Sequence, residues 1–235
     1  RSGADLVTVA SPQRSADIAA QTLPDLITYP LKGDFLTTKH VDDIMDLSGV
    51  RKINSVVLGC GLGRHLTTMS AVRKLISKFS VPLVLDADAL VAVSVEPEVL
   101  RGKHFVMTPH IAELAALLNL EKINEDFDSR MSHAKEAARR YGGVVLLKGH
   151  VDIITDGAST ITNNTGTPFM TKGGFGDVLA GVVGALLARG VGLFEAAHIG
   201  AYINGKAGEH MDFIGESVVA SDIFGYLHKV INKGE

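Results

Sequence analysis

Short apolar runs recur along the chain, and each is bounded by glycine, proline or aspartate. Runs that are this short and this uniformly apolar are typical of strands buried on both faces of a parallel sheet. The pattern therefore predicts a core of short parallel strands. The strand candidates are residues 6–9, 56–58, 83–85, 105–107 and 144–147.

Between these runs, apolar residues recur at helical spacing. Residues 67–79 carry Met69, Val72, Leu75, Ile76 and Phe79 on one stripe, as an amphipathic helix does. Alternation of such helices with strands predicts one α/β domain over residues 1–235, with a mostly parallel central sheet and helices on both faces. Further helices are predicted over residues 111–118, 129–141, 177–189, 193–211 and 218–231, and a hairpin over 152–155 and 159–162 with its turn at Asp156-Gly157.

Composition narrows the class of protein. The length of 235 residues and a hydrophobic content of 46% suit one large domain, and a net charge of −3 argues against a nucleic-acid surface. The single cysteine, Cys60, cannot form an intramolecular disulfide, and no apolar run is long enough to span a bilayer. We expect a soluble, cytoplasmic protein. The chain opens on Arg1 with almost no residues before the first predicted strand, so we expect residues upstream.

The most informative segment is TKGGFGDVLAG, residues 171–181, where glycines crowd against Asp177 just before an apolar helical run. Glycines at a helix N-terminus let backbone N–H groups close around a phosphate. A carboxylate in such a nest repels the anion, and it makes sense as a base that takes a proton from an attacking hydroxyl. The alternative is an aspartate that only caps the helix.

The sequence Gly59-Cys60-Gly61-Leu62-Gly63 follows the strand at 56–58. Its glycines indicate close approach of the backbone to a ligand, or a simple strand-to-helix turn. Cys60 has no obvious partner histidine, which favours a small packed thiol over a nucleophile.

Asp86 and Asp88 follow the strand at 83–85. One of them can cap the next helix, or the two together can hold Mg²⁺ through waters. Both interpretations remain open at this point.

After the strand at 105–107, the sequence favours Thr108 as a helix N-cap with Pro109 at the first helical position. A capping box would then need Glu or Gln at position 111, where Ile111 stands. We therefore interpret His110 and Glu113 as a polar pair directed at a ligand rather than as a cap.

Lys148-Gly149 ends the strand at 144–147, where a lysine is either solvated or bound to a phosphate. The remaining histidines show no metal-ligand spacing, and there is no HExxH motif, cysteine cluster or P-loop. A tightly bound structural metal is not expected.

In this order the motifs resemble the ADP/ATP-dependent NAD(P)H-hydrate dehydratase family of the ribokinase-like superfamily. The chain differs from the family pattern by Cys60 in place of Pro, Ile111-Ala112 in place of Pro-Gly, Phe175 in place of Thr and Thr167 in place of Asn. His110 separates this family from sugar and vitamin kinases, which usually carry Asn there. The matching segments are residues 59–63, 86–90, 110–113, 148–149, 164–166 and 173–177.

The resemblance implies a three-layer ribokinase-like fold, with an earlier strand and substrate loop upstream of Arg1. It also implies nicotinamide cofactor repair: a nucleotide phosphorylates the hydroxyl of hydrated NADH or NADPH, and elimination of phosphate restores the ring. Asp177 would be the base, and Glu113 would organise Mg²⁺ through water. The resemblance assigns the anion hole to Gly174, Phe175 and Gly176, the substrate contacts to Gly61, Gly63, His110 and Asp177, and the ADP or ATP contacts to Lys148, Gly149, His150, Val151, Asp152 and Gly176.

The family is often homotetrameric and is sometimes fused to an epimerase domain, so the resemblance also implies a homo-oligomer and an epimerase partner. Two other functions stay open. One is a kinase of the same fold for a vitamin precursor or sugar, which His110 disfavours. The other is a catalytically weak nucleotide-binding or regulatory protein, which Asp177 disfavours because a pure binder gains nothing from a carboxylate in an anion nest.

Overall fold

The computed structural model describes residues 1–233. Its main sheet has the strand order β3-β4-β5-β6-β7-β8. Strands β3 to β6 are parallel, and β7 and β8 add an antiparallel hairpin at one edge. The strands are β3 (Val56–Leu58), β4 (Leu83–Leu85), β5 (Phe105–Met107), β6 (Val144–Leu147), β7 (Asp152–Thr155) and β8 (Thr160–Asn163).

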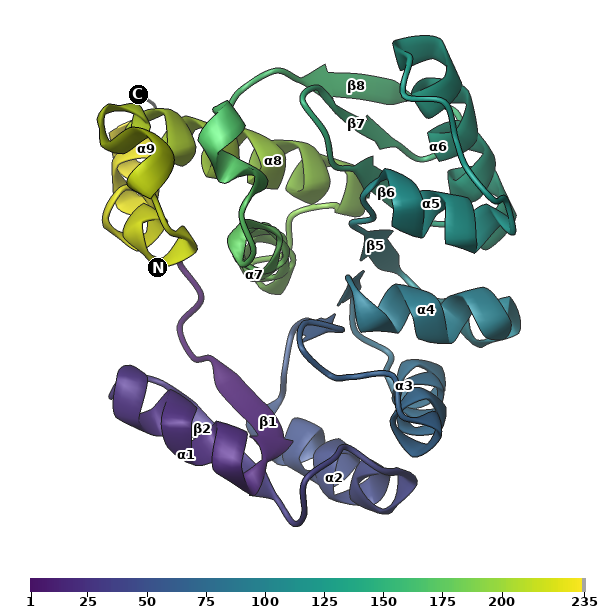
Figure 1. Ribbon diagram of the computed structural model, residues 1–235. Helices are drawn as coiled ribbons and strands as arrows, with labels where there is room; N and C mark the ends of the chain where they lie inside the picture. The colour runs from purple at the N-terminus through teal and green to yellow at the C-terminus, as the bar shows by residue number, and fades with distance from the viewer. Residues whose placement is uncertain (234–235) are drawn as a thin grey trace.

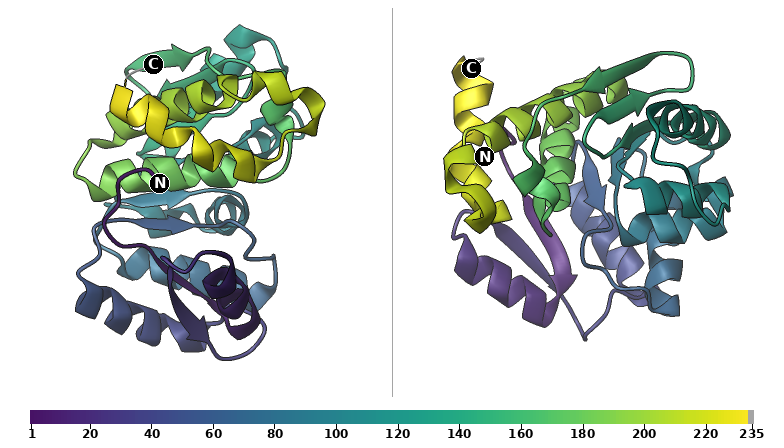
Figure 2. Two further views of the ribbon diagram at one scale, coloured as in Figure 1. Left: turned by 90° about the vertical axis from the view of Figure 1, so that its left-hand side faces the viewer. Right: turned by 45° about the horizontal axis from the view of Figure 1, so that its top comes forward.

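Helices cover both faces of this sheet (Figures 1 and 2). Successive residues of a strand point to opposite sides, so a uniformly apolar strand has two apolar faces to bury. On one face, Leu83, Leu85 and Phe105 belong to a core with residues of α3 (Leu66–Lys78), α4 (Asp88–Val95), α5 (Ile111–Leu118) and α6 (Phe127–Tyr141). On the other, Val84 and Val106 belong to a second core with residues of α7 (Phe175–Ala188), α8 (Leu193–Glu209) and α9 (Leu227–Lys233). The predicted three-layer architecture is confirmed.

The N-terminal part differs from the prediction. A separate parallel pair, β1 (Thr8–Pro12) and β2 (Ile27–Leu31), carries α1 (Gln13–Thr22), and α2 (Val41–Arg51) follows. The predicted strand at 6–9 begins two residues later, and Leu6 and Val7 are exposed. Strand β2 was not predicted, because Pro30 inside it disfavours a strand. Helix α1 was not predicted, because it buries only Ala16 and so lacks a clear apolar stripe.

The predicted C-terminal helix at 218–231 is wrong over its first half. Two short 3₁₀ segments, Asp212–Ser217 and Ala220–Gly225, precede α9. A glycine in the left-handed region, Gly215, interrupts the first of them, and a second glycine ends the other. Among residues 1–233, no helix combines the length and apolar character needed to cross a membrane.

Candidate active site

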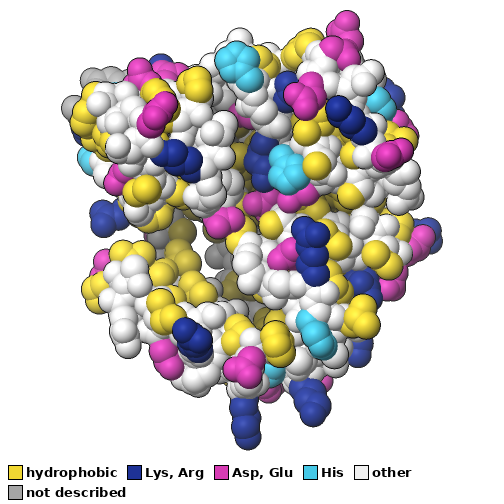
Figure 3. Space-filling model, in the orientation of Figure 1, with side chains coloured by type: hydrophobic (Ala, Val, Ile, Leu, Met, Phe, Trp, Pro, Cys, Tyr) yellow, Lys and Arg dark blue, Asp and Glu magenta, His cyan; other side chains and the backbone are white. Residues whose placement is uncertain are grey.

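The parallel strands place the predicted site residues at one edge of the sheet, because their carboxyl ends all point the same way. Acidic, basic and histidine side chains gather near the centre of the face in Figure 3. The site residues follow β3 (Gly59 to Gly63), β4 (Asp86, Asp88), β5 (His110, Glu113) and β6 (Lys148) in turn.

Asp86 and Lys148 form the central ion pair. Lys148 Nζ lies 2.8 Å from Asp86 Oδ1 and 4.0 Å from Glu113 Oε2. The Asp86 side chain is only 2% exposed, and that of Lys148 is 21% exposed. A carboxylate this deeply buried needs a cation beside it, so the pair holds the ammonium group at the mouth of the site.

Helix α7 brings Asp177 to the same place. Its N-cap is Gly174 at φ 98°, and the helix begins at Phe175, two residues before the predicted start. Built on Gly176, a Cβ would lie 3.3 Å from Lys148 Nζ, so the first turn of α7 rests against the ion pair. Phe175 is buried in the second core, and the first backbone N–H groups of α7 have no acceptor within the helix.

Asp177 does not act as the cap of α7. It is an exposed residue of the first helical turn, and the N-cap Gly174 has no side-chain hydrogen bond. Its carboxylate, the Asp86 carboxylate and the Cys60 sulfur all lie within 4.8 Å of one another. The interpretation of Asp177 as a plain capping residue is therefore wrong.

The Cys60 thiol is inert in this setting. Desolvation and the nearby Asp177 and Asp86 carboxylates raise its pKa to about 12, so it stays protonated at neutral pH. The preceding Gly59 has φ 133°, and a Cβ there would lie 1.7 Å from the Asp86 carbonyl oxygen. Gly59 is therefore required for the close approach of two strand ends, and the interpretation of Cys60 as a packed thiol agrees with its pKa.

The Asp86 and Asp88 side chains have separate partners, and neither caps α4. The N-cap of α4 is Ala87, which has no side-chain hydrogen bond. Asp88 accepts hydrogen bonds from the Gly63 N–H at 2.8 Å and from Arg64 Nε at 2.9 Å, while Asp86 pairs with Lys148. The capping interpretation is therefore wrong, and the two carboxylates have different partners.

The prediction that His110 and Glu113 are not a helix cap is also wrong. His110 is the N-cap of α5, and its Nδ1 accepts from the N–H groups of Ala112 at 3.1 Å and Glu113 at 3.3 Å. Glu113 Oε2 accepts from the His110 N–H at 2.8 Å, which completes a capping box. The helix has the predicted bounds 111–118, so Thr108 is not its N-cap and Pro109 is not its first residue. The His110 ring is still 55% exposed, with Nε2 3.5 Å from Glu113, and can meet a ligand.

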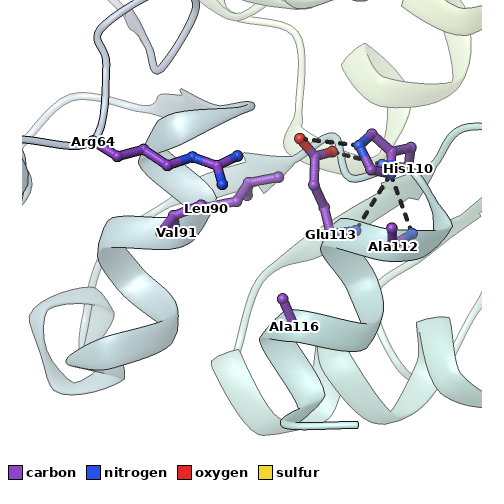
Figure 4. Close-up of a pocket in the computed structure, with 7 residues that line it drawn as sticks. All are labelled: Arg64, Leu90, Val91, His110, Ala112, Glu113 and Ala116. Carbon is purple, nitrogen blue, oxygen red and sulfur yellow. Dashed lines mark hydrogen bonds and ion pairs between the residues drawn. The ribbon is translucent and has the colours of Figure 1, made fainter. Parts of the chain in front are cut away.

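A pocket of about 210 Å³ lies between α4 and α5 (Figure 4). It contains His110 and Glu113 from the predicted site, and Arg64, which was not predicted. Arg64 directly follows Gly63, and this position next to the glycine loop is the feature of the sequence that could have indicated a site residue. The lining residues are Arg64, Leu90, Val91, His110, Ala112, Glu113 and Ala116.

The predicted nucleotide segment 148–152 is an ordered turn. The Gly149 N–H donates to Asp152 Oδ1 at 3.0 Å, and Asn163 Nδ2 donates to Asp152 Oδ2 at 3.0 Å. Burial raises the pKa of Asp152 above its ordinary value, against the lowering effect of these hydrogen bonds. His150 is an exposed residue of this turn.

The buried Arg130, which was not predicted from the sequence, packs against this turn. Arg130 Nη2 donates to the Val151 carbonyl oxygen at 2.8 Å. A Cβ on Gly149 would meet the same guanidinium nitrogen at 2.1 Å, so the arginine packs directly against the backbone of the turn.

Comparison with known proteins identifies the family. A model of the NAD(P)H-hydrate dehydratase family matches residues 1–226. The chain belongs to this family. It is 34% identical over 235 residues to the ADP-dependent (S)-NAD(P)H-hydrate dehydratase of Cenarchaeum symbiosum, a match that covers 98% of this chain and 80% of that protein.

The bifunctional NAD(P)H-hydrate repair enzyme Nnr of Pyrobaculum aerophilum is 41% identical over 240 residues, covering 99% of this chain but 46% of that protein. The chain thus spans about half the length of such relatives. Among solved structures, the ADP/ATP-dependent NAD(P)H-hydrate dehydratase of Bacillus subtilis, co-crystallised with ATP/Mg²⁺ and soaked with CoA, superposes with a TM-score of 0.77 at 21% identity, over 100% of this chain and 83% of that one. The fold is ribokinase-like.

Proposed function

We propose that this chain dehydrates hydrated NADH or NADPH with ADP or ATP as phosphate donor, and so repairs damaged nicotinamide cofactors. The observation that carries the proposal is the position of Asp177. Its carboxylate stands on the first turn of α7, where N–H groups lack helical acceptors, and beside the Asp86–Lys148 pair. A base, an anion-binding helix end and a fixed ammonium group together suit phosphoryl transfer.

The proposed chemistry runs in two stages. Asp177 accepts the proton of the ring hydroxyl as its oxygen attacks the terminal phosphorus of the nucleotide, and the bond from that phosphorus to the bridging oxygen breaks. The new phosphate ester then eliminates: its carbon–oxygen bond breaks and phosphate leaves with the electron pair. A proton passes from the neighbouring ring carbon to water, and the electrons of that carbon–hydrogen bond form the double bond. The N–H groups of Gly174, Phe175 and Gly176 would hold the phosphoryl charge, and Lys148 would neutralise it.

The residues fit a Mg²⁺ ion that arrives with the nucleotide. Mg²⁺ favours one or two carboxylates together with water and phosphate oxygens, and Asp86 and Asp177 offer such oxygens within 4.8 Å of each other. The protonated Cys60 sulfur is a poor ligand for this hard cation. Glu113 lies 4.0 Å from Lys148 and would contact the ion through water. When bound, Mg²⁺ supplies positive charge to the transferring phosphoryl group.

The two ligands would occupy opposite sides of this centre. We assign the hydrated nicotinamide to Gly61, Gly63, His110 and Asp177. Cys60 of the glycine loop lies within 4.8 Å of Asp177, and His110 contacts Glu113, which lies 4.0 Å from Lys148. The nucleotide would lie on the turn from Lys148 through Gly149, His150 and Val151 to Asp152, and on Gly176. The C. symbiosum relative is named as ADP-dependent, so ADP is the donor to test first.

We further propose that this chain works with an epimerase activity and as a homo-oligomer. The P. aerophilum relative is named bifunctional and extends well beyond the matched half, which leaves room for a second activity in longer relatives. Size-exclusion chromatography with light scattering tests the assembly.

The decisive experiment mixes the protein with Mg²⁺, hydrated NADH or NADPH, and ADP or ATP, and follows the return of reduced-nicotinamide absorbance. We expect recovery that depends on the nucleotide. Accumulation of a phosphorylated product without recovery would indicate a kinase, and nucleotide binding without turnover would indicate a regulatory protein.

Asp177→Asn tests the base assignment, and we expect it to abolish recovery while nucleotide binding persists. Asp128→Asn is the matched control, because Asp128 is an exposed acid in the first turn of α6. An active Asp177→Asn variant would show that another group takes the proton.

A further inference from the structure

We infer that the α4–α5 pocket binds the diphosphate-bearing half of the dinucleotide, with Arg64 as the group that binds its phosphates. This inference rests on the proposed function, and it names the part of the substrate that the pocket receives. Figure 4 shows Arg64 extending over the first turn of α4, above Leu90 and Val91, toward α5.

The Arg64 side chain is oriented and yet accessible. Its Nε lies 2.9 Å from Asp88 Oδ1, and the other Asp88 oxygen accepts from the Gly63 N–H at 2.8 Å. The carboxylate is therefore fixed from both sides and holds the base of the guanidinium group. Arg64 is 68% exposed, and the ion pair with Asp88 uses only Nε of its five N–H donors. The terminal nitrogens are available for a phosphate, which arginine binds through paired hydrogen bonds.

The chemistry of the walls suits a nucleotide. Leu90, Val91, Ala112 and Ala116 provide apolar surface for a ribose or a base. Among the described residues that line the pocket, Arg64 is the one lysine or arginine. Glu113 and His110 supply the remaining polar groups at the end near Lys148. Apolar walls with a few placed polar groups are the usual form of a small-molecule site.

The pocket is continuous with the proposed reaction centre through Glu113. Glu113 lines the pocket and also lies 4.0 Å from Lys148, which pairs with Asp86. A dinucleotide whose nicotinamide reaches Asp177 past His110 can therefore extend its diphosphate along α4 toward Arg64. A volume of about 210 Å³ holds part of such a molecule and leaves the rest in solvent.

A purely structural role for Arg64 makes a different prediction. An exposed ion pair contributes little to stability, and losing it should not affect one substrate more than another. If Arg64 binds phosphate, its loss affects only substrates that carry phosphate.

The test compares Arg64→Ala and Arg64→Lys on two substrates, hydrated NADH and hydrated reduced nicotinamide riboside, which lacks both phosphates. For Arg64→Ala we expect KM for hydrated NADH to rise about tenfold or more, with kcat within about twofold, as loss of a charge-assisted hydrogen bond predicts. KM for the riboside should not change. Arg64→Lys should restore part of the effect, because lysine keeps the charge without the planar fork.

Arg73→Ala is the matched control, since Arg73 Nε also lies 2.9 Å from a carboxylate, that of Glu96, but outside the pocket. A second readout needs no turnover: calorimetric titration with NADH, whose affinity should fall about tenfold or more in Arg64→Ala and stay unchanged in Arg73→Ala.

The inference is overturned if Arg64→Ala leaves NADH binding unchanged, or if it raises KM equally for the dinucleotide and the riboside. If the unmodified protein dehydrates neither substrate, the proposed function fails. The NADH titration still decides the role of Arg64 in that case.

Discussion

Replacement of Lys148 by methionine tests the role of the buried ion pair. Asp86 is 2% exposed and has its ammonium partner at 2.8 Å, so Lys148→Met would leave an uncompensated carboxylate inside the protein. Breaking a buried pair on one side typically costs about 3–5 kcal/mol. Because the Lys148 side chain is 21% exposed and water can reach it, we expect the lower end, about 3 kcal/mol. For a domain of this size, that corresponds to a fall in Tm of about 6–12 °C.

Urea titration at neutral pH and calorimetry measure this change. Lys78→Met is the matched control, because Lys78 pairs with Asp42 at the same distance of 2.8 Å while both side chains are exposed; it should leave the unfolding midpoint nearly unchanged. The double variant Lys148→Met/Asp86→Leu should regain most of the loss, since both charges are then gone. A loss below about 1 kcal/mol for Lys148→Met, or a double variant as unstable as the sum of the single ones, would refute the reasoning.

Two further predictions concern the glycine loop after β3. Gly59→Ala should lower Tm severely or prevent folding, because its Cβ would lie 1.7 Å from the Asp86 carbonyl oxygen. Gly61→Ala, whose Cβ would have nothing within 4 Å, should lower the free energy of unfolding by only about 1 kcal/mol. Equal thermal unfolding midpoints for the two variants would contradict this. With its pKa raised from 9.0 to about 12, Cys60 should be only about one-thousandth thiolate at pH 9, so iodoacetamide should modify the native chain far more slowly than the urea-unfolded chain at that pH. Because the native state keeps the Cys60 thiol proton to higher pH than the unfolded state does, the free energy of unfolding should fall as pH rises from 9 toward 12. Equal alkylation rates in the native and unfolded chains would show that the pKa of the thiol is not perturbed.

Strands β4, β5 and β6 could be predicted from the sequence because burial on both faces demands uniformly apolar residues. Strand β3 also has the predicted bounds, although Val57 in it is 40% exposed. Strand β2 could not be predicted in the same way, since it is only partly buried and contains the exposed Pro30. The local sequence pattern predicts a strand or helix well only where the surrounding structure requires residues of one kind, such as apolar residues in a buried strand.

The site was partly predictable for a related reason. Glycines, aspartates and a lysine at strand ends indicated which residues lie together, because the carboxyl ends of parallel strands share one edge. The sequence could not show that Asp86 pairs with Lys148, since that depends on the order of strands in the sheet. The capping role of His110 was missed because histidine is outside the usual N-cap residues, although an unprotonated Nδ1 accepts hydrogen bonds as a carboxylate does.

The span of the Asp86–Lys148 pair along the chain has a consequence for how the protein folds. Strands β7 and β8 are joined by a short turn and can pair early, whereas the ion pair joins residues that are 62 positions apart and needs β4, β5 and β6 already side by side. We therefore expect the candidate site to form late, after most of the strands have paired. During partial unfolding it should come apart early, so that activity disappears in mild denaturant while the helices and most strands persist.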